Sequence, residues 1–286
     1  MRKVQNMIKY LAVQKTKQKE KRMAGTKGKT DSKKSIRMGA VKVTKAKKSE
    51  SVKKYKRILL KLSGEALAKE GGGYNEEEIT RIAAQVKKII QSGTDVGIVI
   101  GGGNIWRGKS NLEIDRPKSD SIGMLATVMN CIYVSEHFRA AKIKTAIFTP
   151  WPVSTFTEIF SKDKANEYFA EGRAVFFAGG TGHPYFSTDT GVVLRAMEMD
   201  ADVILAAKNI DGVYDSDPAK NPDAKKFKTI SIHEVVERKL GVIDLTASAL
   251  LDEHQIPMRI FALKEKNSIV KALGNRFNGT DVTINK

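Results

Sequence analysis

From residue 55 onward, the chain alternates short apolar runs typical of β-strands with longer segments whose apolar residues recur at helical spacing. The run RILLKL at 57–62 precedes NEEEITRIAAQVKKIIQS at 75–92, which carries an amphipathic helical pattern. Asn75 is suited to cap this helix, because acidic residues follow it in the first turn. We expect further strands at 95–100, 144–148, 174–180, 202–207, 258–263 and 280–285, and further helices at 121–141, 162–171, 190–199, 246–254 and 267–274.

This order of strands and helices predicts an α/β fold, in which helices cover both faces of a mostly parallel sheet. Ligands of such sheets bind beyond the carboxyl ends of the strands, where glycine-rich turns collect. Four segments qualify, namely KLSGEA (61–66), IGGGN (100–104), AGGTGHPYFSTD (178–189) and NIDGVYDSDP (209–218). We therefore expect a binding site at the edge of the sheet where these turns meet.

One of these turns raises a competing interpretation. The segment GNIWRGKS, Gly103 to Ser110, fits the phosphate-binding P-loop pattern GxxxxGK[ST]. A P-loop needs a helix directly after its lysine, because the amino end of that helix supplies N–H donors. The segment that follows Lys109 has no sustained apolar stripe, and Pro117 would interrupt a helix running through it. We interpret the match as accidental and expect Lys109 to face solvent.

The charge of the chain is concentrated in one segment. The formal net charge is +18, and residues 1–54 contain 19 Lys and Arg against 3 Asp and Glu. Such a lysine-rich segment buries too little apolar surface to offset its ordering entropy, so we predict a disordered extension at 1–54 and one folded domain at 55–286. The extension is either a solvated leader or an arm that binds nucleic acid or ribosomes; an organellar transit peptide fits less well, because lysine dominates over arginine.

Composition also bears on the compartment and on the class of protein. No apolar run approaches the ~18 residues that span a membrane, so we expect no membrane segment. Cys131 is the single cysteine, and it lies in an apolar helical pattern that predicts a buried thiol. With no pair of cysteines for a disulfide, a cytoplasmic location is the default expectation.

Taken together and in order, the glycine-rich segments resemble those of the bacterial uridylate kinases of the amino-acid-kinase family. The resemblance rests on YKRILLKLSGEAL (55–67), VIGGGNIWRG (99–108), SDSIGMLATVMN (119–130), AGGTGHPYFSTD (178–189) and DGVYDSDP (211–218). It covers residues 55–286 and implies a three-layer α/β/α fold. It also implies a homohexamer that uses ATP, UMP and Mg²⁺, is activated by GTP and inhibited by UTP, and makes UDP in pyrimidine biosynthesis. Another kinase of the same family, a P-loop nucleotide kinase and a nucleic-acid-binding regulator are the alternatives.

Transfer between two phosphates requires cations more than it requires a base. Two unit charges 4 Å apart repel by ~4 kcal/mol at an effective dielectric of 20, so donor and acceptor must be neutralised before they meet. A phosphate monoester is already mostly dianionic at neutral pH, and no catalytic histidine is needed. Lys61, at the end of the first strand, is our candidate catalytic cation. Asp189, at a helix start, is either a plain cap or, by resemblance, the carboxylate that orients Lys61.

The resemblance divides the remaining candidates between two substrates. The arginine fork suits phosphate, and glycines let backbone approach a ligand closely. Asn209 is uncertain against Lys208, because this loop is about one residue shorter than in many relatives. The predicted ATP-binding residues are Lys61, Leu62, Ser63, Gly64, Gly103, Arg107, Asn209, Tyr214 and Asp217.

On the acceptor side, Asp120 is either a helix-start acid or, by resemblance, the partner of the UMP ribose. His183 stands where the family usually has asparagine, which leaves the GTP response and the subunit contact at this position open. Asp244 occupies another recurring acidic position, to which we assign no role, and we assign no residue to a metal. The predicted UMP-binding residues are Gly102, Asp120, Thr181, Gly182, His183, Pro184, Tyr185, Phe186, Ser187 and Thr188.

Overall fold

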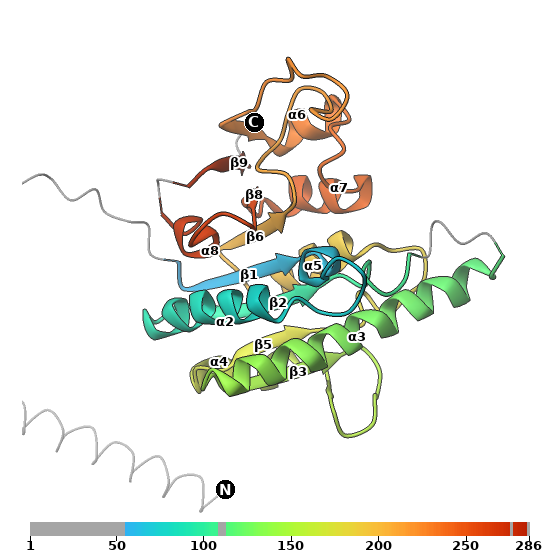
Figure 1. Ribbon diagram of the computed structural model, residues 1–286, viewed down its shortest axis with the longest axis vertical. Helices are drawn as coiled ribbons and strands as arrows, with labels where there is room; N and C mark the ends of the chain where they lie inside the picture. Colours follow the sequence, from blue (N-terminus) through green and yellow to red (C-terminus); the bar gives the residue numbers. More distant parts are fainter. Residues whose placement is uncertain (1–54, 108–112, 275–276, 285–286) are drawn as a thin grey trace, which may run out of the picture. The chain divides into compact units, whose positions relative to one another are not determined.

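The computed structural model describes residues 55–107, 113–274 and 277–284. Within these ranges, nine strands form one sheet in the order β4-β3-β5-β2-β1-β6-β8-β9-β7 (Figure 1). Neighbouring strands are parallel except β8 and β9, which are antiparallel, so the prediction of a mostly parallel sheet is confirmed. The strands are Arg57–Leu62 (β1), Asp95–Ile100 (β2), Thr145–Thr149 (β3), Glu158–Ile159 (β4), Ala174–Phe177 (β5), Val203–Lys208 (β6), Thr229–Ser231 (β7), Met258–Ala262 (β8) and Gly279–Thr283 (β9).

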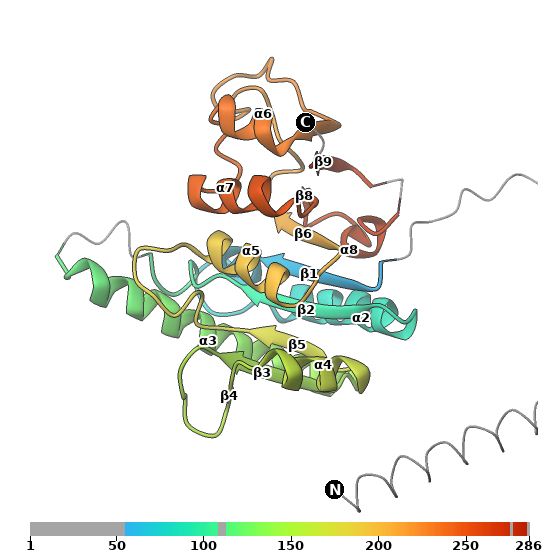
Figure 2. The ribbon, with the colours of Figure 1, turned by 180° about the vertical axis from the view of Figure 1, so that it is seen from behind.

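Helices cover both faces of the sheet and enclose two apolar cores. Helices α2 and α3 lie in front of the sheet in Figure 1, and α4 and α5 lie in front in the reverse view of Figure 2. Buried residues of α2, α3 and α8 form one core with the sheet, and those of α4 to α7 form the other. The helices are Gly64–Leu67 (η1, a 3₁₀ turn), Glu76–Gln91 (α2), Arg116–Ala140 (α3), Lys162–Ala170 (α4), Thr188–Glu198 (α5), Ile232–Glu237 (α6), Leu245–His254 (α7) and Ser268–Lys271 (α8).

The start of α3 differs from the prediction. We expected this helix from residue 121 and took Pro117 as a helix breaker, but the helix begins at Arg116. Asp115 is its N-cap and accepts a hydrogen bond from the Lys118 N–H. Pro117 therefore lies in the first turn, where a missing N–H costs no intrahelical hydrogen bond. The helix is also less buried than expected, because one of its faces is exposed to solvent.

Other local predictions have mixed outcomes. Asn75 caps α2 as predicted, with its side-chain oxygen accepting from the Glu78 N–H at 3.1 Å. The short strands β4 and β7 were not predicted, because two or three residues are too few to show an alternating pattern. The predicted extension at 1–54 lies outside the described residues. No helix within the described ranges is both long and apolar enough to cross a bilayer.

The position of β1 organises the site. It lies between β2 and β6, parallel to both, so that Lys61 is level with Val99 on one side and with Ala206 on the other. The carboxyl ends of the three strands therefore reach the same edge of the sheet. The turns that follow β1 and β2, and the Lys208 side chain at the end of β6, are brought together there by the register alone.

Candidate active site

The Lys61 side chain forms an ion pair at this edge of the sheet. Its Nζ lies 3.0 Å from Oδ1 of Asp189, and the two side chains are 12% and 21% exposed. Asp189 is held in the first turn of α5 by Ser187, the N-cap, whose Oγ accepts from the N–H of Asp189 and of Thr190. Asp189 is thus not the cap of its helix. Its carboxylate faces the strand-end lysine, the arrangement that an orienting role requires.

A second lysine approaches the same carboxylate. Lys208, the last residue of β6, has its Nζ 3.9 Å from Oδ2 of Asp189 and donates a hydrogen bond to the carbonyl of Val242. Burial lowers the pKa of Lys208, and the nearby Lys61 lowers it further, against the opposing effect of Asp189. Asn209, our predicted contact, is exposed. The structure therefore brings Lys208 rather than Asn209 to the ion pair.

The first two glycine-rich turns, at 63–64 and 101–104, are in close contact. A Cβ added to Gly64, in η1 after β1, would come within 2.3 Å of Oδ1 of Asn104 and 2.4 Å of the Gly101 carbonyl. Ser63 caps this 3₁₀ turn by accepting from the Ala66 N–H at 3.2 Å. Glycine is thus required at position 64 for close packing, which brings the backbone after β1 alongside the backbone after β2.

A cavity of about 610 Å³ opens beside these turns. It is lined by part of the predicted acceptor set together with Gly103 and Arg107, which we had assigned to ATP. Arg107 lies 2.5 Å from a carboxylate oxygen of Glu65, so this guanidinium is paired within the protein. The lining residues from the acceptor set are Gly102, Asp120, Tyr185, Phe186, Ser187 and Thr188.

Asp120 anchors the acceptor loop to α3. Its Oδ2 accepts from the backbone N–H of Tyr185 at 2.8 Å, and both of its carboxylate oxygens accept from Nε of Arg116. Because α3 begins at Arg116, Asp120 lies inside the helix rather than at its start. Tyr185 has a φ of 71°, an uncommon conformation for a non-glycine residue that this contact holds in place. Asp120 therefore shapes the loop as well as lining the cavity.

The rest of the predicted acceptor loop faces elsewhere. Thr181 and His183 line a separate hollow on the α5 side, together with Phe160 and Arg195. Gly182 borders a small pocket beside Trp151. Only the second half of the 181–188 segment lines the large cavity, a division that the sequence pattern did not indicate.

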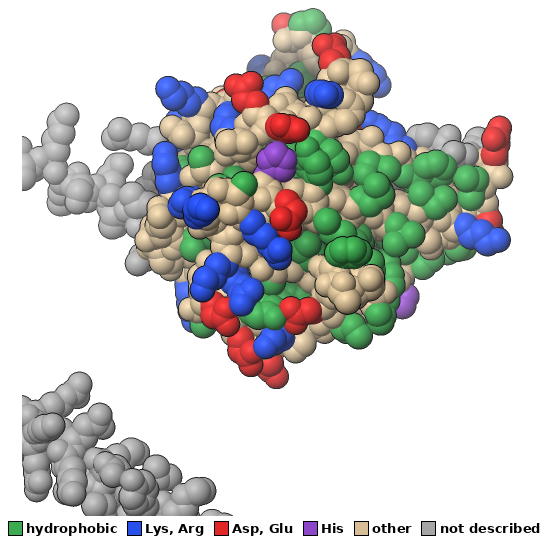
Figure 3. Space-filling model, turned by 60° about the horizontal axis from the view of Figure 1, so that its bottom comes forward, with side chains coloured by type: hydrophobic (Ala, Val, Ile, Leu, Met, Phe, Trp, Pro, Cys, Tyr) green, Lys and Arg blue, Asp and Glu red, His purple; other side chains and the backbone are tan. Residues whose placement is uncertain are grey.

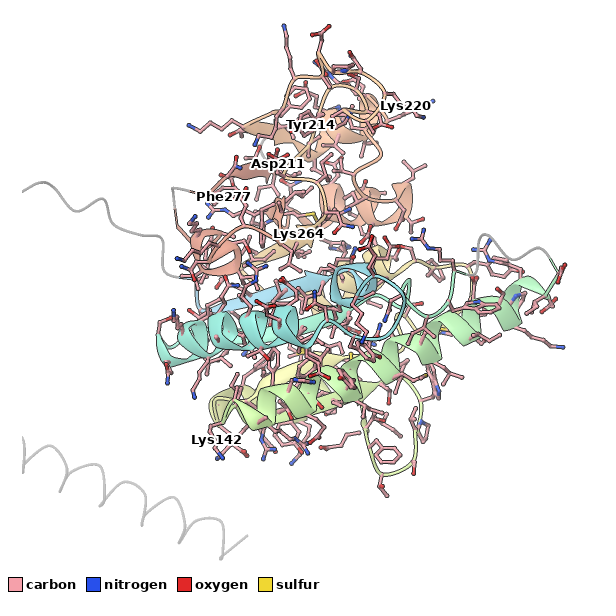
Figure 4. All side chains as sticks on the ribbon, viewed as in Figure 1. Lys142, Asp211, Tyr214, Lys220, Lys264 and Phe277 are labelled. Carbon is pink, nitrogen blue, oxygen red and sulfur yellow. The ribbon has the colours of Figure 1, made fainter. Side chains whose placement is uncertain are left out.

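A second cavity, of about 470 Å³, lies on the β6 side of the ion pair. Lys208, Tyr214 and Asp217 line it, as does the 238–242 segment. The Tyr214 hydroxyl donates to Asp211 at 2.7 Å, and the two residues lie close together in the upper part of Figure 4. Burial alone would raise the pKa of Asp211, but hydrogen bonds from Lys226 and Tyr214 lower it below the usual range. Tyr214 is thus oriented by an ionised carboxylate.

Comparison with known proteins identifies the family to which this chain belongs. The sequence model of the amino acid kinase family matches residues 56–262, which is most of the chain. The chain belongs to the amino acid kinase family. Among curated relatives of this kinase, a protein named uridylate kinase from Rickettsia bellii is 43% identical over 232 residues, covering 80% of this chain and 97% of that protein.

Solved structures agree with the fold of this amino acid kinase. A crystal structure of UMP kinase from Bacillus anthracis has a TM-score of 0.78 at 34% identity, covering 81% of this chain and 97% of that one. A UMP kinase from Ureaplasma parvum has a TM-score of 0.76 at 33% identity, covering 80% and 98%. The expected α/β fold and the family resemblance are therefore confirmed.

The P-loop alternative is not favoured for this kinase. Lys109 lies outside the described residues, so its predicted exposure stays a prediction. Among the described residues, the first helix after Lys109 is α3, which begins at Arg116, whereas a P-loop lysine is followed directly by its helix.

One acidic residue of this kinase has a role that the sequence did not reveal. Asp244 is the N-cap of α7, and its carboxylate also accepts from the hydroxyls of Ser187 and Thr190. It therefore joins the start of α7 to the start of α5, which carries Asp189. From the sequence we assigned Asp244 no role, and its partners on α5 lie more than fifty residues away along the chain.

Proposed function

We propose that this protein transfers the γ-phosphoryl group of ATP to UMP, giving UDP and ADP. The observation that carries the proposal is that the cluster of Asp189 and its two lysines adjoins residues of both cavities. Thr188 and Thr190, its neighbours on α5, line the larger cavity, while Lys208, 3.9 Å from Asp189, lines the smaller one. Two phosphate-bearing ligands, one in each cavity, would meet at this cluster. The names of the similar proteins supply the substrates.

The cluster suits direct in-line transfer. Catalysis of phosphoryl transfer is mostly positioning and charge neutralisation, which fixed cations and backbone N–H groups provide. In our proposal Lys61 neutralises the charge on the transferring group, and Asp189 holds its ammonium in place. Leu62, Ser63, Gly64 and Gly103 supply backbone around the phosphates, and no general base is required.

The remaining roles follow from the cavities. We place the adenosine of ATP against Tyr214 and Asp217 in the smaller cavity, with Lys208 in place of Asn209 toward the phosphates. UMP occupies the larger cavity, with its ribose at Asp120 and its phosphate within reach of Arg107, which must then leave Glu65. Of the 181–188 loop, the half from Tyr185 onward would contact UMP directly, whereas the half from Thr181 to Pro184 shapes it.

Mg²⁺ fits this site as part of the nucleotide complex. Within the described ranges, no group of three or more His, Cys, Asp or Glu side chains is arranged to hold a metal ion. Mg²⁺ usually keeps several waters and binds through substrate phosphates with one or two carboxylates. Asp189 is the carboxylate that lies at the phosphate end of the site. When bound, the ion would neutralise phosphate charge alongside Lys61.

Substrate choice tests the proposal. ADP release would be measured in a coupled assay with ATP and one of UMP, CMP, aspartate, glutamate or carbamate. We expect UMP to support turnover far better than the others, and Asp189→Asn to lower kcat with UMP. Activity on an amino acid or carbamate without activity on UMP would overturn the assignment.

We further propose that the protein forms a homohexamer. Helix α3 exposes Ile122, Leu125 and Met129, which follow one another at helical spacing and are 36%, 47% and 58% exposed. Figure 3 shows hydrophobic side chains gathered along the end of the molecule that α3 forms. Exposed apolar stripes of this kind mark protein contacts. Leu125→Glu should lower the mass measured by light scattering, and an unchanged mass would contradict this assembly face.

Regulation by GTP and UTP is also part of the proposal. Arg139, Lys142, Lys144 and Arg173 line a hollow of about 360 Å³. Figure 4 shows Lys142 at the opposite end of the domain from Tyr214, far from the donor cavity. Four cations suit an anionic effector such as GTP, and UTP would compete for the nucleotide cavities instead. Activation by GTP should be lost in the Lys144→Ala/Arg173→Ala variant; retained activation would exclude this hollow.

For residues 1–54 we propose an extension separate from the kinase domain, in a cytoplasmic enzyme. Its 19 Lys and Arg against 3 Asp and Glu support weak binding of nucleic acid through counterion release. RNA binding by the full chain should fall steeply as salt rises and should be lost when residues 1–54 are deleted. Binding that survives the deletion would rule out the extension as the nucleic-acid contact.

A further inference from the structure

Helix α3 contains a fully buried carboxamide. Asn130 is 0% exposed, and its side chain makes four hydrogen bonds. Oδ1 accepts from the Tyr74 hydroxyl at 2.7 Å and from Nδ2 of Asn104 at 3.0 Å. Nδ2 donates to the Gly101 carbonyl and to Oδ1 of Asn104, each at 2.7 Å. The amide thus uses its full capacity of two donated and two accepted bonds.

Three of these four bonds go to the turn after β2. Asn104 and Asn130 exchange reciprocal amide hydrogen bonds, and the third bond holds the carbonyl of Gly101. The same two groups of the turn, Oδ1 of Asn104 and the Gly101 carbonyl, are those that a Cβ added to Gly64 would meet. Asn130 therefore stands directly behind the contact between the two turns that we assign to phosphate.

The same face of α3 also holds the third glycine-rich turn. Gly123, Thr127 and Asn130 are spaced four and three residues apart, which places them on one face of the helix. A Cβ on Gly102 would lie 2.7 Å from the Gly123 carbonyl, so the turn after β2 rests on this face. Thr127 is 4% exposed, and its hydroxyl oxygen accepts from the Gly179 N–H at 2.8 Å.

We propose that Asn130 is a positioning residue for phosphoryl transfer. Through its amide pair with Asn104, it sets the spacing between the turn at 63–64 and the turn at 101–104. Thr127, one turn earlier on the helix, sets the position of the turn that leads into the acceptor loop. The inference rests on the proposed function, because it assigns those turns to phosphates.

Physical chemistry favours this role over simple packing. Burying an amide costs free energy unless every polar atom is paired, so an apolar residue would be the simpler choice for filling a helix face. A saturated pair fixes direction as well as distance, and a displacement of about 1 Å at a reacting centre can cost ~10²-fold in rate. Two α3 side chains that both bond the site turns give one rigid element control over their relative position.

Substitution of Asn130 tests the proposal in the full-length enzyme. Asn130→Asp keeps the shape and the acceptor but loses both donated bonds, and Asn130→Leu removes all four at similar volume. We expect kcat to fall about 10- to 100-fold in both, by the positioning argument, while the KM for UMP stays within about 3-fold. Ser135→Ala is the matched control, since Ser135 lies on the same helix, is 1% exposed and donates a hydrogen bond to the Ile132 carbonyl within that helix.

The Asn130 and Thr127 variants are expected to differ in whether they change kcat or the KM for UMP. Thr127→Val should raise the KM for UMP more than it lowers kcat, because its bond goes to the turn at the acceptor side. Asn104→Ala combined with Asn130→Ala should cost little more than either change alone, because each removes the same pair. Additive losses, or equal effects of the Asn130 and Thr127 variants on kcat and KM, would overturn the proposal.

A readout independent of activity distinguishes positioning from loss of fold. Hydrogen–deuterium exchange of the 101–106 peptide should accelerate in Asn130→Asp and stay unchanged in Ser135→Ala. If Asn130→Asp melts earlier but leaves exchange in this peptide and the kcat of the folded enzyme unchanged, the residue only stabilises the fold and the proposal is wrong. Should wild-type enzyme prefer another acceptor than UMP, the same ratios are measured with that acceptor, so failure of the function and failure of the positioning role remain distinct.

Discussion

The phosphate turns and the donor-side loop are held in place by different forces. At 63–64 and 101–104, backbone packs closely: a Cβ on Gly64 would lie 2.4 Å from the Gly101 carbonyl, one on Gly102 would lie 2.7 Å from the Gly123 carbonyl, and a buried amide pair supports the contact. At 211–228, a buried hydrogen bond from the Val213 N–H to the Thr280 hydroxyl is joined by contacts of charged side chains that water reaches. Lys226 donates to Asp211 and to Asn278, each at 2.7 Å, and its ion pair is 26% and 30% exposed.

This difference fits what each region has to do. Transfer requires reacting atoms to be placed within a fraction of an ångström, and close packing of backbone provides that. The adenosine end of a nucleotide has only to be bound, and exposed hydrogen bonds and ion pairs supply moderate affinity without rigid placement. Changes in the first region should therefore affect kcat, and changes in the second should affect the KM for ATP.

The largest effect is expected from Lys61→Ala. Loss of one preorganised charge-stabilising group costs on the order of 10²–10³ in kcat, and Lys61 is the cation paired with Asp189, whose neighbours Thr188 and Thr190 line the larger cavity. Steady-state kinetics with ATP and UMP would measure this. Lys109→Ala is the control, and we expect it to retain turnover; the reverse result would restore the P-loop interpretation.

Gly64→Ala should have the next largest effect on kcat. The added methyl would lie 2.3 Å from Asn104 and 2.4 Å from the Gly101 carbonyl, so the turns must separate. We expect kcat to fall about 10- to 100-fold, with a loss of ~1–3 kcal/mol in unfolding free energy. Gly241→Ala, on the donor side, is the matched change, because nothing lies within 4 Å of its added Cβ. Equal losses in the two variants would remove the contrast between the regions.

Lys226→Met should have a smaller effect, confined to the donor side. A partly exposed ion pair contributes up to ~1 kcal/mol, so the KM for ATP should rise at most about 5-fold. The KM for UMP and kcat should stay near wild type. Initial rates at low and high salt would show a larger difference at low salt, because screening weakens the pair in wild type. A change confined to kcat would contradict this view.

The smallest effect concerns acid stability. Because the pKa of Asp211 is lowered in the folded protein, its ionised form stabilises the fold above an unfolded pKa of about 3.9, and this contribution is lost as pH falls through the folded value. Asp211→Asn should therefore unfold at a lower temperature than wild type at pH 6, and the gap should narrow toward pH 3. Melting curves between these values would test the sign; a gap that widens in acid would refute it.

The sequence allowed the sheet, most helices and the strand-end lysine to be predicted, because each depends on a local pattern. The beginning of α3 was misplaced because proline disfavours a helix interior but suits the first turn, and only the Asp115 cap distinguishes the two cases. The division of the 181–188 loop between the large cavity and two smaller hollows could not be predicted, since it follows from long-range contacts such as that of Asp120 with Tyr185. The sequence indicated only that Asn130 belongs to a buried helix. Its hydrogen bonds could not be predicted, because the partners come from two distant turns.

The central place of β1 has a consequence for how the protein is made. Its partner β2 is synthesised soon afterwards, but its other partner, β6, begins at Val203, and the two strands are in contact along their length. At about 5–20 residues per second, a nascent chain waits for several seconds with one edge of β1 uncovered. Contacts between such distant segments form slowly, and unpaired strand edges associate with other chains. Chaperones that bind nascent chains would therefore matter most in this interval, before β6 pairs with the free edge of β1 beside Lys61.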